Sequence, residues 1–178
     1  MHIAKRSKAE PLICLHPNES YEHISPENIV SRLKREGEII VVEYDDFFNP
    51  TITCAFPGLV DVDLSRRVFI NTFKKYRGTD KPRFYPKCML VEIGADHAIV
   101  QRHDGVLFRI NHAFPSEILL NIVNNPGITL WDLITLEITA FSKEYPDIAE
   151  EDLLDVIEAT VDAIGFYIYV LDLVEMKF

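Results

Sequence analysis

The residues of this chain that could do chemistry are its histidines, cysteines and carboxylates. Cys14 and His16 lie two positions apart, while His97, His103 and Asp104 flank a predicted hairpin. Metal sites in proteins use spacings such as Cys-x-x-Cys or His-Glu-x-x-His, and the sequence has neither. It also has no glycine-rich phosphate loop and no Gly-x-Ser-x-Gly elbow. These patterns predict no metal ion, no cofactor and no catalytic residue, and they favour a protein that is not an enzyme.

A second group of candidate residues is basic and belongs to a predicted helix, Ser65–Tyr76, and the residue after it. This basic patch consists of Arg66, Arg67, Lys74, Lys75 and Arg77. Clustered positive charge attracts phosphates, so a nucleic-acid-associated transcriptional regulator that uses residues 65–77 is an alternative function. The same side chains could instead dock against an acidic surface, either within the chain or between two copies in a homo-oligomer.

The charges of the chain are divided unequally between its halves. Residues 1–90 hold 14 Lys+Arg and 12 Asp+Glu, whereas residues 91–178 hold 4 and 16, so that +2 and −12 sum to the net charge of −10. No Lys or Arg occurs between Lys143 and Lys177, the stretch that contains the last predicted helix. Such a surface repels phosphates, and phosphate contacts supply most of the non-specific affinity for DNA. We therefore expect no nucleic-acid binding through the second half.

Helix caps, apolar runs and prolines divide the chain into residues 1–86 and 87–178. In the first region a helix begins at Ser25 and ends at Gly37, and residues 38–44 form a buried strand. The helix Ser65–Tyr76 then precedes a proline-containing linker, Thr79–Pro86. We predict an αβ region of unknown role.

The second region, residues 87–178, is predicted to contain three strands, three helices and a closing strand. The strands are expected at Met89–Ile93, Ala98–Arg102 and Val106–Ile110. Asp104-Gly105, between the last two, is typical of a hairpin turn. The helices are expected to begin near Pro115, Thr129 and Asp147. Gly165 is expected to end the third helix. The alternation of apolar and aromatic residues in Phe166–Leu173 predicts the closing strand.

Strands that precede three helices suggest a winged helix-turn-helix with its sheet placed first, within an α+β chain. Four segments carry a closer likeness: HDGVLFRIN (103–111), SEILLNIV (116–123), GITLWDLITLEI (127–138) and YPDIAEEDLLDVIEATVDAIGF (145–166). In them the second half resembles the PqqD-like family, small winged-helix domains that are also called precursor-peptide recognition elements. The resemblance covers about half of the chain. It implies a peptide-binding domain that serves a peptide-modifying enzyme.

The resemblance also implies where a peptide would bind. A partner would add a strand beside the third strand, Val106–Ile110, and place its side chains against the third helix. The groove residues implied in this way are Val106, Leu107, Phe108, Leu154 and Ile157. Arg109 would pair with a partner carboxylate, whereas Asp155 and Glu158 would prefer a basic group. Each apolar residue of this set could equally belong to the core, because apolar positions at strand or helix spacing usually face inward.

We therefore predict a non-catalytic peptide- or protein-binding module, with a precursor peptide as a candidate partner. The alternatives are the nucleic-acid-associated regulator and a small enzyme whose site lies between the halves and uses His16, His97 or His103. No apolar run approaches the roughly 20 residues needed to cross a bilayer, and no signal core follows the basic N-terminus. We expect no membrane partner, a cytoplasmic location and free thiols at the three scattered cysteines.

Overall fold

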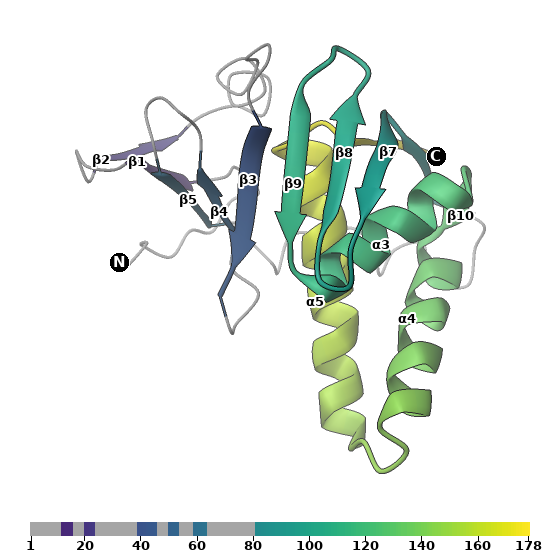
Figure 1. The fold of residues 1–178 in the computed structure, drawn as a ribbon. Coiled ribbons are helices and arrows are strands. Elements are labelled where there is room, and N and C mark those ends of the chain that lie inside the picture. The colour runs from purple at the N-terminus through teal and green to yellow at the C-terminus, as the bar shows by residue number, and fades with distance from the viewer. Residues whose placement is uncertain (1–11, 16–19, 24–38, 46–49, 54–58, 64–80) are drawn as a thin grey trace.

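The computed structural model describes residues 12–15, 20–23, 39–45, 50–53, 59–63 and 81–178 of the chain. The helices expected at 25–37 and at Ser65–Tyr76 lie outside these residues, and so does the basic patch. The described part is α+β, as the sequence predicts, with two sheets and three helices (Figure 1). None of the helices in this part is long and apolar enough to cross a bilayer.

The larger sheet joins strands from both halves of the sequence. Its strands are β1 (Leu12–Leu15), β2 (Ser20–His23), β3 (Ile39–Tyr44), β4 (Pro50–Thr53), β5 (Leu59–Asp63), β7 (Cys88–Ile93), β8 (Ala98–Arg102) and β9 (Leu107–Asn111). They lie in the order β2-β1-β5-β4-β3-β9-β8-β7, and every neighbouring pair is antiparallel except β3 and β9. The three strands predicted for the second half are confirmed to within two residues. They extend a larger sheet, however, instead of forming one of their own.

The hairpin of β8 and β9 follows directly from its sequence. Buried and partly exposed residues alternate along both strands, which is the period-2 pattern of a sheet with one covered face. Gly105, in the turn, has a φ of +94°, a conformation that favours glycine. The N–H of Arg102 donates to the carbonyl of Val106 over 2.8 Å and closes the turn that Asp104-Gly105 predicts.

A second, smaller sheet corrects two predictions. Its strands are β6 (Arg83–Pro86), β10 (Ile128–Thr129) and β11 (Val174–Lys177), in the antiparallel order β10-β6-β11. Residues 83–86, expected to be linker, therefore form its central strand. Phe84 is fully buried there, and this burial outweighs the turn signal of the nearby prolines. The closing strand exists, but it is β11 and not Phe166–Leu173.

The helices are α3 (Ala113–Asn124), α4 (Leu130–Glu144) and α5 (Glu150–Tyr169). His112 caps α3 because its Nδ1 accepts from the N–H of Phe114 over 3.2 Å. Thr129 caps α4 as predicted, since its hydroxyl accepts from the N–H of Asp132 over 3.1 Å. Asp147 was the expected cap of α5, but the N-cap is Ala149, which makes no side-chain hydrogen bond.

The third helix continues through Gly165, where the sequence predicts its end. Gly165 is buried, and Phe166 and Tyr167 after it are also fully buried. Residues 166–171 are apolar at every position, a pattern that fits a helix as well as a strand. Burial of Phe166 and Tyr167 in the core favours the helix here. α5 ends at Tyr169, and Asp172, in the turn that follows it, has a φ of +54°.

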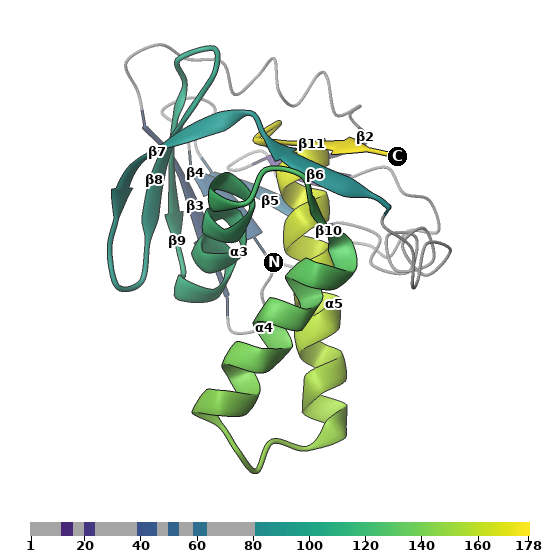
Figure 2. The same ribbon diagram turned by 90° about the vertical axis from the view of Figure 1, so that its right-hand side faces the viewer.

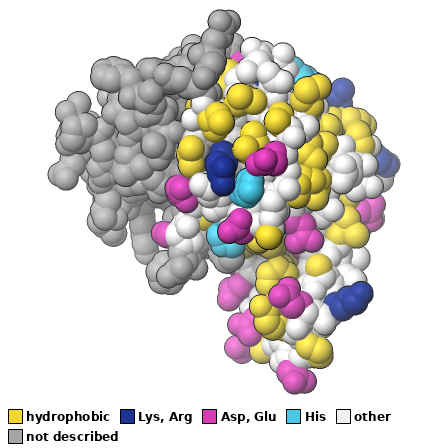
Figure 3. Space-filling model, in the orientation of Figure 1, with side chains coloured by type: hydrophobic (Ala, Val, Ile, Leu, Met, Phe, Trp, Pro, Cys, Tyr) yellow, Lys and Arg dark blue, Asp and Glu magenta, His cyan; other side chains and the backbone are white. Residues whose placement is uncertain are grey.

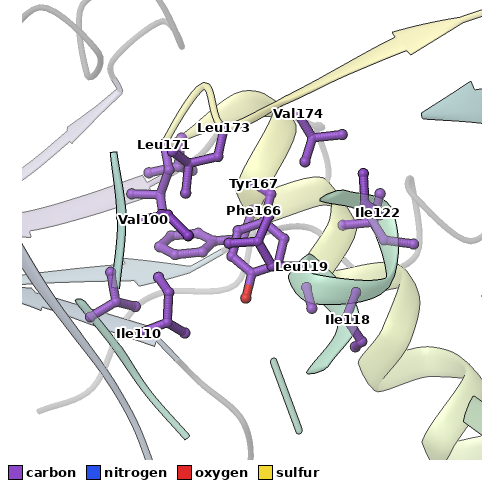
Figure 4. Packing of buried hydrophobic residues seen from close by; sticks show 14 of the residues in the cluster. Val100, Ile110, Ile118, Leu119, Ile122, Phe166, Tyr167, Leu171, Leu173 and Val174 are labelled. Atoms are coloured by element: carbon purple, nitrogen blue, oxygen red, sulfur yellow. The ribbon is translucent and has the colours of Figure 1, made fainter. Parts of the chain in front are cut away.

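α3 and the C-terminal half of α5 lie against one face of the β9-β8-β7 part of the large sheet, and within the described part of the chain no helix covers the other face (Figures 1 and 2). Tyr167 and Phe166 of α5 reach into the core between that sheet and α3 (Figure 4). The Tyr167 hydroxyl donates to the carbonyl of Pro115 over 2.6 Å, so the polar end of this buried ring is satisfied. Below the sheet in Figure 1, α4 and α5 continue side by side as a helical hairpin.

Candidate functional site

The groove implied by the family resemblance is not formed as expected. Val106 and Phe108 are 3% and 0% exposed, so both belong to the core. Leu107 and Arg109 alternate with them and lie on the open face of the sheet, half-buried. Of the α5 residues, Leu154, Asp155 and Glu158 are exposed and Ile157 packs partly against the core. All four belong to the half of α5 that leads toward the tip of the hairpin (Figure 1).

The edge of β9 is also unavailable for an added strand. On one side β9 pairs with β8, and on the other it pairs in parallel with β3, so that Ile40 lies beside Phe108 and Val42 beside Ile110. A peptide could therefore bind beside β9 only by displacing β3. The sequence could not show this, because the pairing joins segments that are far apart in the chain and nothing local marks two strands as partners.

The strand at the end of the sheet is β7, and it carries an unusual concentration of exposed apolar side chains. Met89, Val91 and Ile93 are 58%, 54% and 52% exposed. The pairing of β7 with β8 shifts register between Leu90 and Glu92, which is a bulge at Val91. Among the described residues β7 has one neighbour only, so its other edge presents backbone N–H and C=O groups.

The open face beside this edge is largely apolar. Ile39 lies opposite Leu107 in register, and Ile99 lies opposite Arg109. Figure 3 shows this face directly: hydrophobic side chains surround a small group of basic, acidic and histidine side chains. We call the edge strand and this face together the β7 surface and define it by Met89, Val91, Ile93, Ile99 and Leu107; of these, Ile93 pairs with the buried Ala98 and so lies at the edge on the covered side of the sheet.

At the carboxyl ends of β3 and β9 the open face ends in a polar cavity of about 540 Å³. The Nε of Arg109 donates to the Oδ1 of Asn111 over 2.7 Å, and the Nδ2 of Asn111 donates to Glu43 over 2.9 Å. His112 and Asp96 also line it. This chain of hydrogen bonds joins β3 to β9 and holds Arg109 across the open face. Arg109 is half-buried on this face, and its pairing with a partner carboxylate stays a prediction.

His97 and His103, the two candidate histidines that the structure describes, lie at opposite ends of β8. His97 lies in the turn between β7 and β8, where its Nε2 is 2.9 Å from Glu92 and its Nδ1 is 3.5 Å from Asp96. Its ring occupies the space that a Cβ at Gly94 would need. His103 is in the turn at the opposite end of β8, and His16 lies outside the described residues. Among the residues that the structure describes, no group of three or more His, Cys, Asp or Glu could hold a metal ion.

Two further polar groups in the core have structural rather than chemical roles. Arg102 is 3% exposed; its Nε and Nη2 donate to Asp104 over 2.8 and 2.9 Å, and its Nη1 donates to the carbonyl of Leu171 over 2.7 Å. It therefore ties the β8–β9 turn to the segment after α5. Cys88 is buried, and burial raises the pKa of its thiol to about 12, so that the thiolate is scarce at neutral pH.

Sequence reasoning missed the β7 surface. The run Cys88–Ile93 is apolar at every position but Glu92, and such a run predicts a strand buried on both faces. Only the position at the end of the sheet leaves Met89 and Val91 in solvent. Comparisons with protein-family models, with curated proteins and with solved structures give no match for this chain.

Proposed function

We propose that this chain is a non-catalytic module that binds an extended peptide, or an extended segment of a partner protein, along the β7 surface. The observation that carries the proposal is the β7 strand itself, whose outer edge lacks a neighbour in the described part of the chain and whose three large apolar side chains are more than half exposed. An added strand would satisfy the backbone groups of that edge, and its side chains would cover the apolar ones.

The winged-helix and PqqD-like assignment belongs to this proposal. It is supported by the order of elements after residue 87, in which three strands precede three helices and a final strand. Our proposal differs from the family expectation in the strand that receives the peptide, because β3 already occupies the free side of β9. A precursor peptide presented to a modifying enzyme is the partner class that the resemblance favours.

Arg109 and the polar cavity add specificity to this mode of binding. Arg109 lies on the open face opposite Ile99, two strands from the β7 edge, and pairs with Asn111 through its Nε. A carboxylate from a part of the partner that continues past the added strand and over the open face would find the remaining guanidinium donors there. The neighbouring Glu43 and Asp96 would disfavour a second acidic group, so we expect partners with few negative charges in this segment.

The test is a selection of binding peptides from a random peptide library with the intact protein. Selected peptides are titrated against wild type, against the double variant Met89→Lys/Val91→Lys, and against Leu136→Lys. Leu136 is a similarly exposed apolar residue on α4, at 45%, so it is the matched control. We expect the double variant to lose about tenfold or more in affinity, because it places two charges where apolar side chains should be buried. The control should bind as wild type does.

A second measurement guards against indirect effects. Amide hydrogen exchange should slow at β7 when the peptide binds, because the outer N–H groups gain partners. Equal affinity of the double variant and wild type, with the circular dichroism spectrum of the variant unchanged, would remove the β7 surface from consideration.

A further inference from the structure

The helical hairpin of α4 and α5 ends in a cavity that the proposed function does not use. Its volume is about 650 Å³, and it is lined by residues from the end of α4, the connecting turn and the start of α5. These segments form the tip of the hairpin, which lies below the sheet in Figures 1 and 2. The apolar part of its wall is formed by Phe141, Tyr145, Pro146 and Ile148. Backbone hydrogen bonds from Tyr145 to Phe141 and from Ile148 to Tyr145 shape the connecting turn.

Two aromatic rings form the rigid side of this tip cavity. The rings of Phe141 and Tyr145 have centroids 6.2 Å apart and are tilted by 33° to each other. Phe114 of α3 meets Phe141 edge to face, at 5.4 Å and 81°, and so supports it from behind. Tyr145 is 54% exposed. An exposed tyrosine ring packed against the half-buried Phe141 offers its other face to a ligand.

The rim of the tip cavity is acidic. It carries the side chains of Glu144, Asp147 and Asp152. All three are exposed, and within the described part of the chain none of them forms an ion pair. Asp152 also lies in the first turn of α5, where a negative charge stabilises the helix. That stabilisation accounts for an acidic residue at this position of α5. It does not account for the apolar and aromatic residues that line the cavity beside Asp152.

We infer that the tip cavity binds the cationic side chain of an arginine or lysine from a basic segment of a partner protein. A cation over the face of Tyr145 is attracted by the ring, and its stem covers Pro146 and Ile148. The three carboxylates add long-range attraction and repel acidic ligands. The acidic rim also argues against a membrane, because the anionic lipids of a bilayer surface would be repelled.

A second copy of the chain is the less favourable occupant. Residues 91–178, which carry the tip cavity, have 16 acidic and 4 basic residues, so two such halves repel each other, and a second copy would have to enter through the basic patch of its first half. A basic partner is attracted by the same negative charge. The tip cavity and the β7 surface are formed by different elements, so the two proposals can fail independently.

The experiment is an NMR titration of the isotope-labelled full chain with the peptide acetyl-Ala-Arg-Leu-Arg-Ala-amide. A second titration uses the peptide in which both arginines are replaced by glutamate. We expect the amide signals of Phe141, Tyr145 and Ile148 to shift with the arginine peptide only. The affinity should fall with added salt, because the attraction is partly between exposed charges.

Variants make the assignment specific. Tyr145→Ala should weaken the arginine peptide about three- to fivefold, whereas Tyr145→Phe, which keeps the ring, should change it less than twofold. Asp152→Asn should weaken it about two- to threefold. Glu175→Gln removes the same charge from an exposed position on β11 and should have no effect. The variant Met89→Lys/Val91→Lys should bind the peptide as wild type does, which separates this proposal from the β7 surface.

Several results would overturn the inference. The absence of shifts at the solubility limit of the arginine peptide would be one of them. Equal binding of the glutamate peptide, or equal losses in Asp152→Asn and Glu175→Gln, would be others. Self-association of the wild type in sedimentation that Tyr145→Ala abolishes would assign the tip cavity to a second copy instead.

Discussion

At the scale of single residues, the least expected group in the core is the carboxylate of Glu137. It is 0% exposed on α4, and one of its oxygens accepts from the Nδ2 of Asn121 on α3 over 2.9 Å. The other oxygen has no hydrogen-bond partner among the residues that the structure describes. Burial, together with the nearby charge of Glu117, raises the pKa of Glu137 to about 7. The protein therefore holds a buried carboxyl group that changes its charge near neutral pH.

This raised pKa predicts a pH dependence of stability. Because the folded state binds the proton more tightly than the unfolded state, the stabilisation is complete below the ordinary pKa of glutamate and is lost as the pH rises through about 7. We expect Glu137→Gln, which does not titrate, to exceed the wild-type free energy of unfolding by about 1–2 kcal/mol at pH 8, after allowance for solvent screening. At pH 4.5 the two should be nearly equal. Urea unfolding at several pH values measures the difference.

A control for this prediction is Glu117→Gln. It removes the neighbouring negative charge and so lowers the pKa of Glu137 in the folded state, which should make the loss of stability with rising pH smaller and complete at a lower pH. A constant difference between Glu137→Gln and wild type from pH 4.5 to 8 would contradict the assignment of the titration to Glu137.

At the scale of elements, α5 is the part that holds the layers together. Its Tyr167 is fully buried, and the hydroxyl of that residue donates to the carbonyl of Pro115, in the first turn of α3. We expect Tyr167→Phe to lower the free energy of unfolding by about 1–2 kcal/mol, because the buried carbonyl loses its donor while the ring stays in place. Urea denaturation of both proteins measures this change. An unchanged free energy of unfolding in Tyr167→Phe would show that only the ring of Tyr167, and not its hydroxyl, stabilises the fold.

The second half shows which elements a sequence can predict. The strands β7, β8 and β9 and the starts of α3 and α4 are close to their predicted positions, because alternation, the Asp104-Gly105 turn and the Thr129 cap are all local signals. The end of α5 was predicted too early at Gly165. There, tertiary burial of Phe166 and Tyr167 outweighs the low helix propensity of a single glycine.

The candidate site was less predictable than the elements around it. Leu107 and Arg109 lie on an accessible face, whereas Val106 and Phe108 are buried. The family resemblance predicted which strand is involved, but it did not predict which face of that strand is covered. The missing information is the position of β3 beside β9 and of β7 at the end of the sheet. Strand order depends on contacts between distant segments, which no local pattern encodes.

At the scale of the whole molecule, the first and second halves share one sheet. Ile40 and Val42 of β3 are 1% and 0% exposed, and they lie beside Phe108 and Ile110 of β9. We expect a fragment of residues 81–178, which lacks β3, to lose at least about 3 kcal/mol in free energy of unfolding or to aggregate through the uncovered edge. Urea denaturation and light scattering of the fragment and the full chain distinguish these outcomes. A fragment as stable as the full chain would show that the second half folds as an independent unit.

The parallel pair also has a consequence for the order of folding. The side chains of Glu43 and Asn111 that join β3 to β9 are 68 residues apart in the chain. The hairpins β7–β8 and β8–β9 close over short turns and can form early. As the ribosome releases the chain from its N-terminus, β3 emerges long before β9. The apolar side chains of β3 therefore stay exposed to solvent until β9 has been synthesised. Nascent chains halted before residue 107 should therefore recruit chaperones more strongly than chains halted after α5.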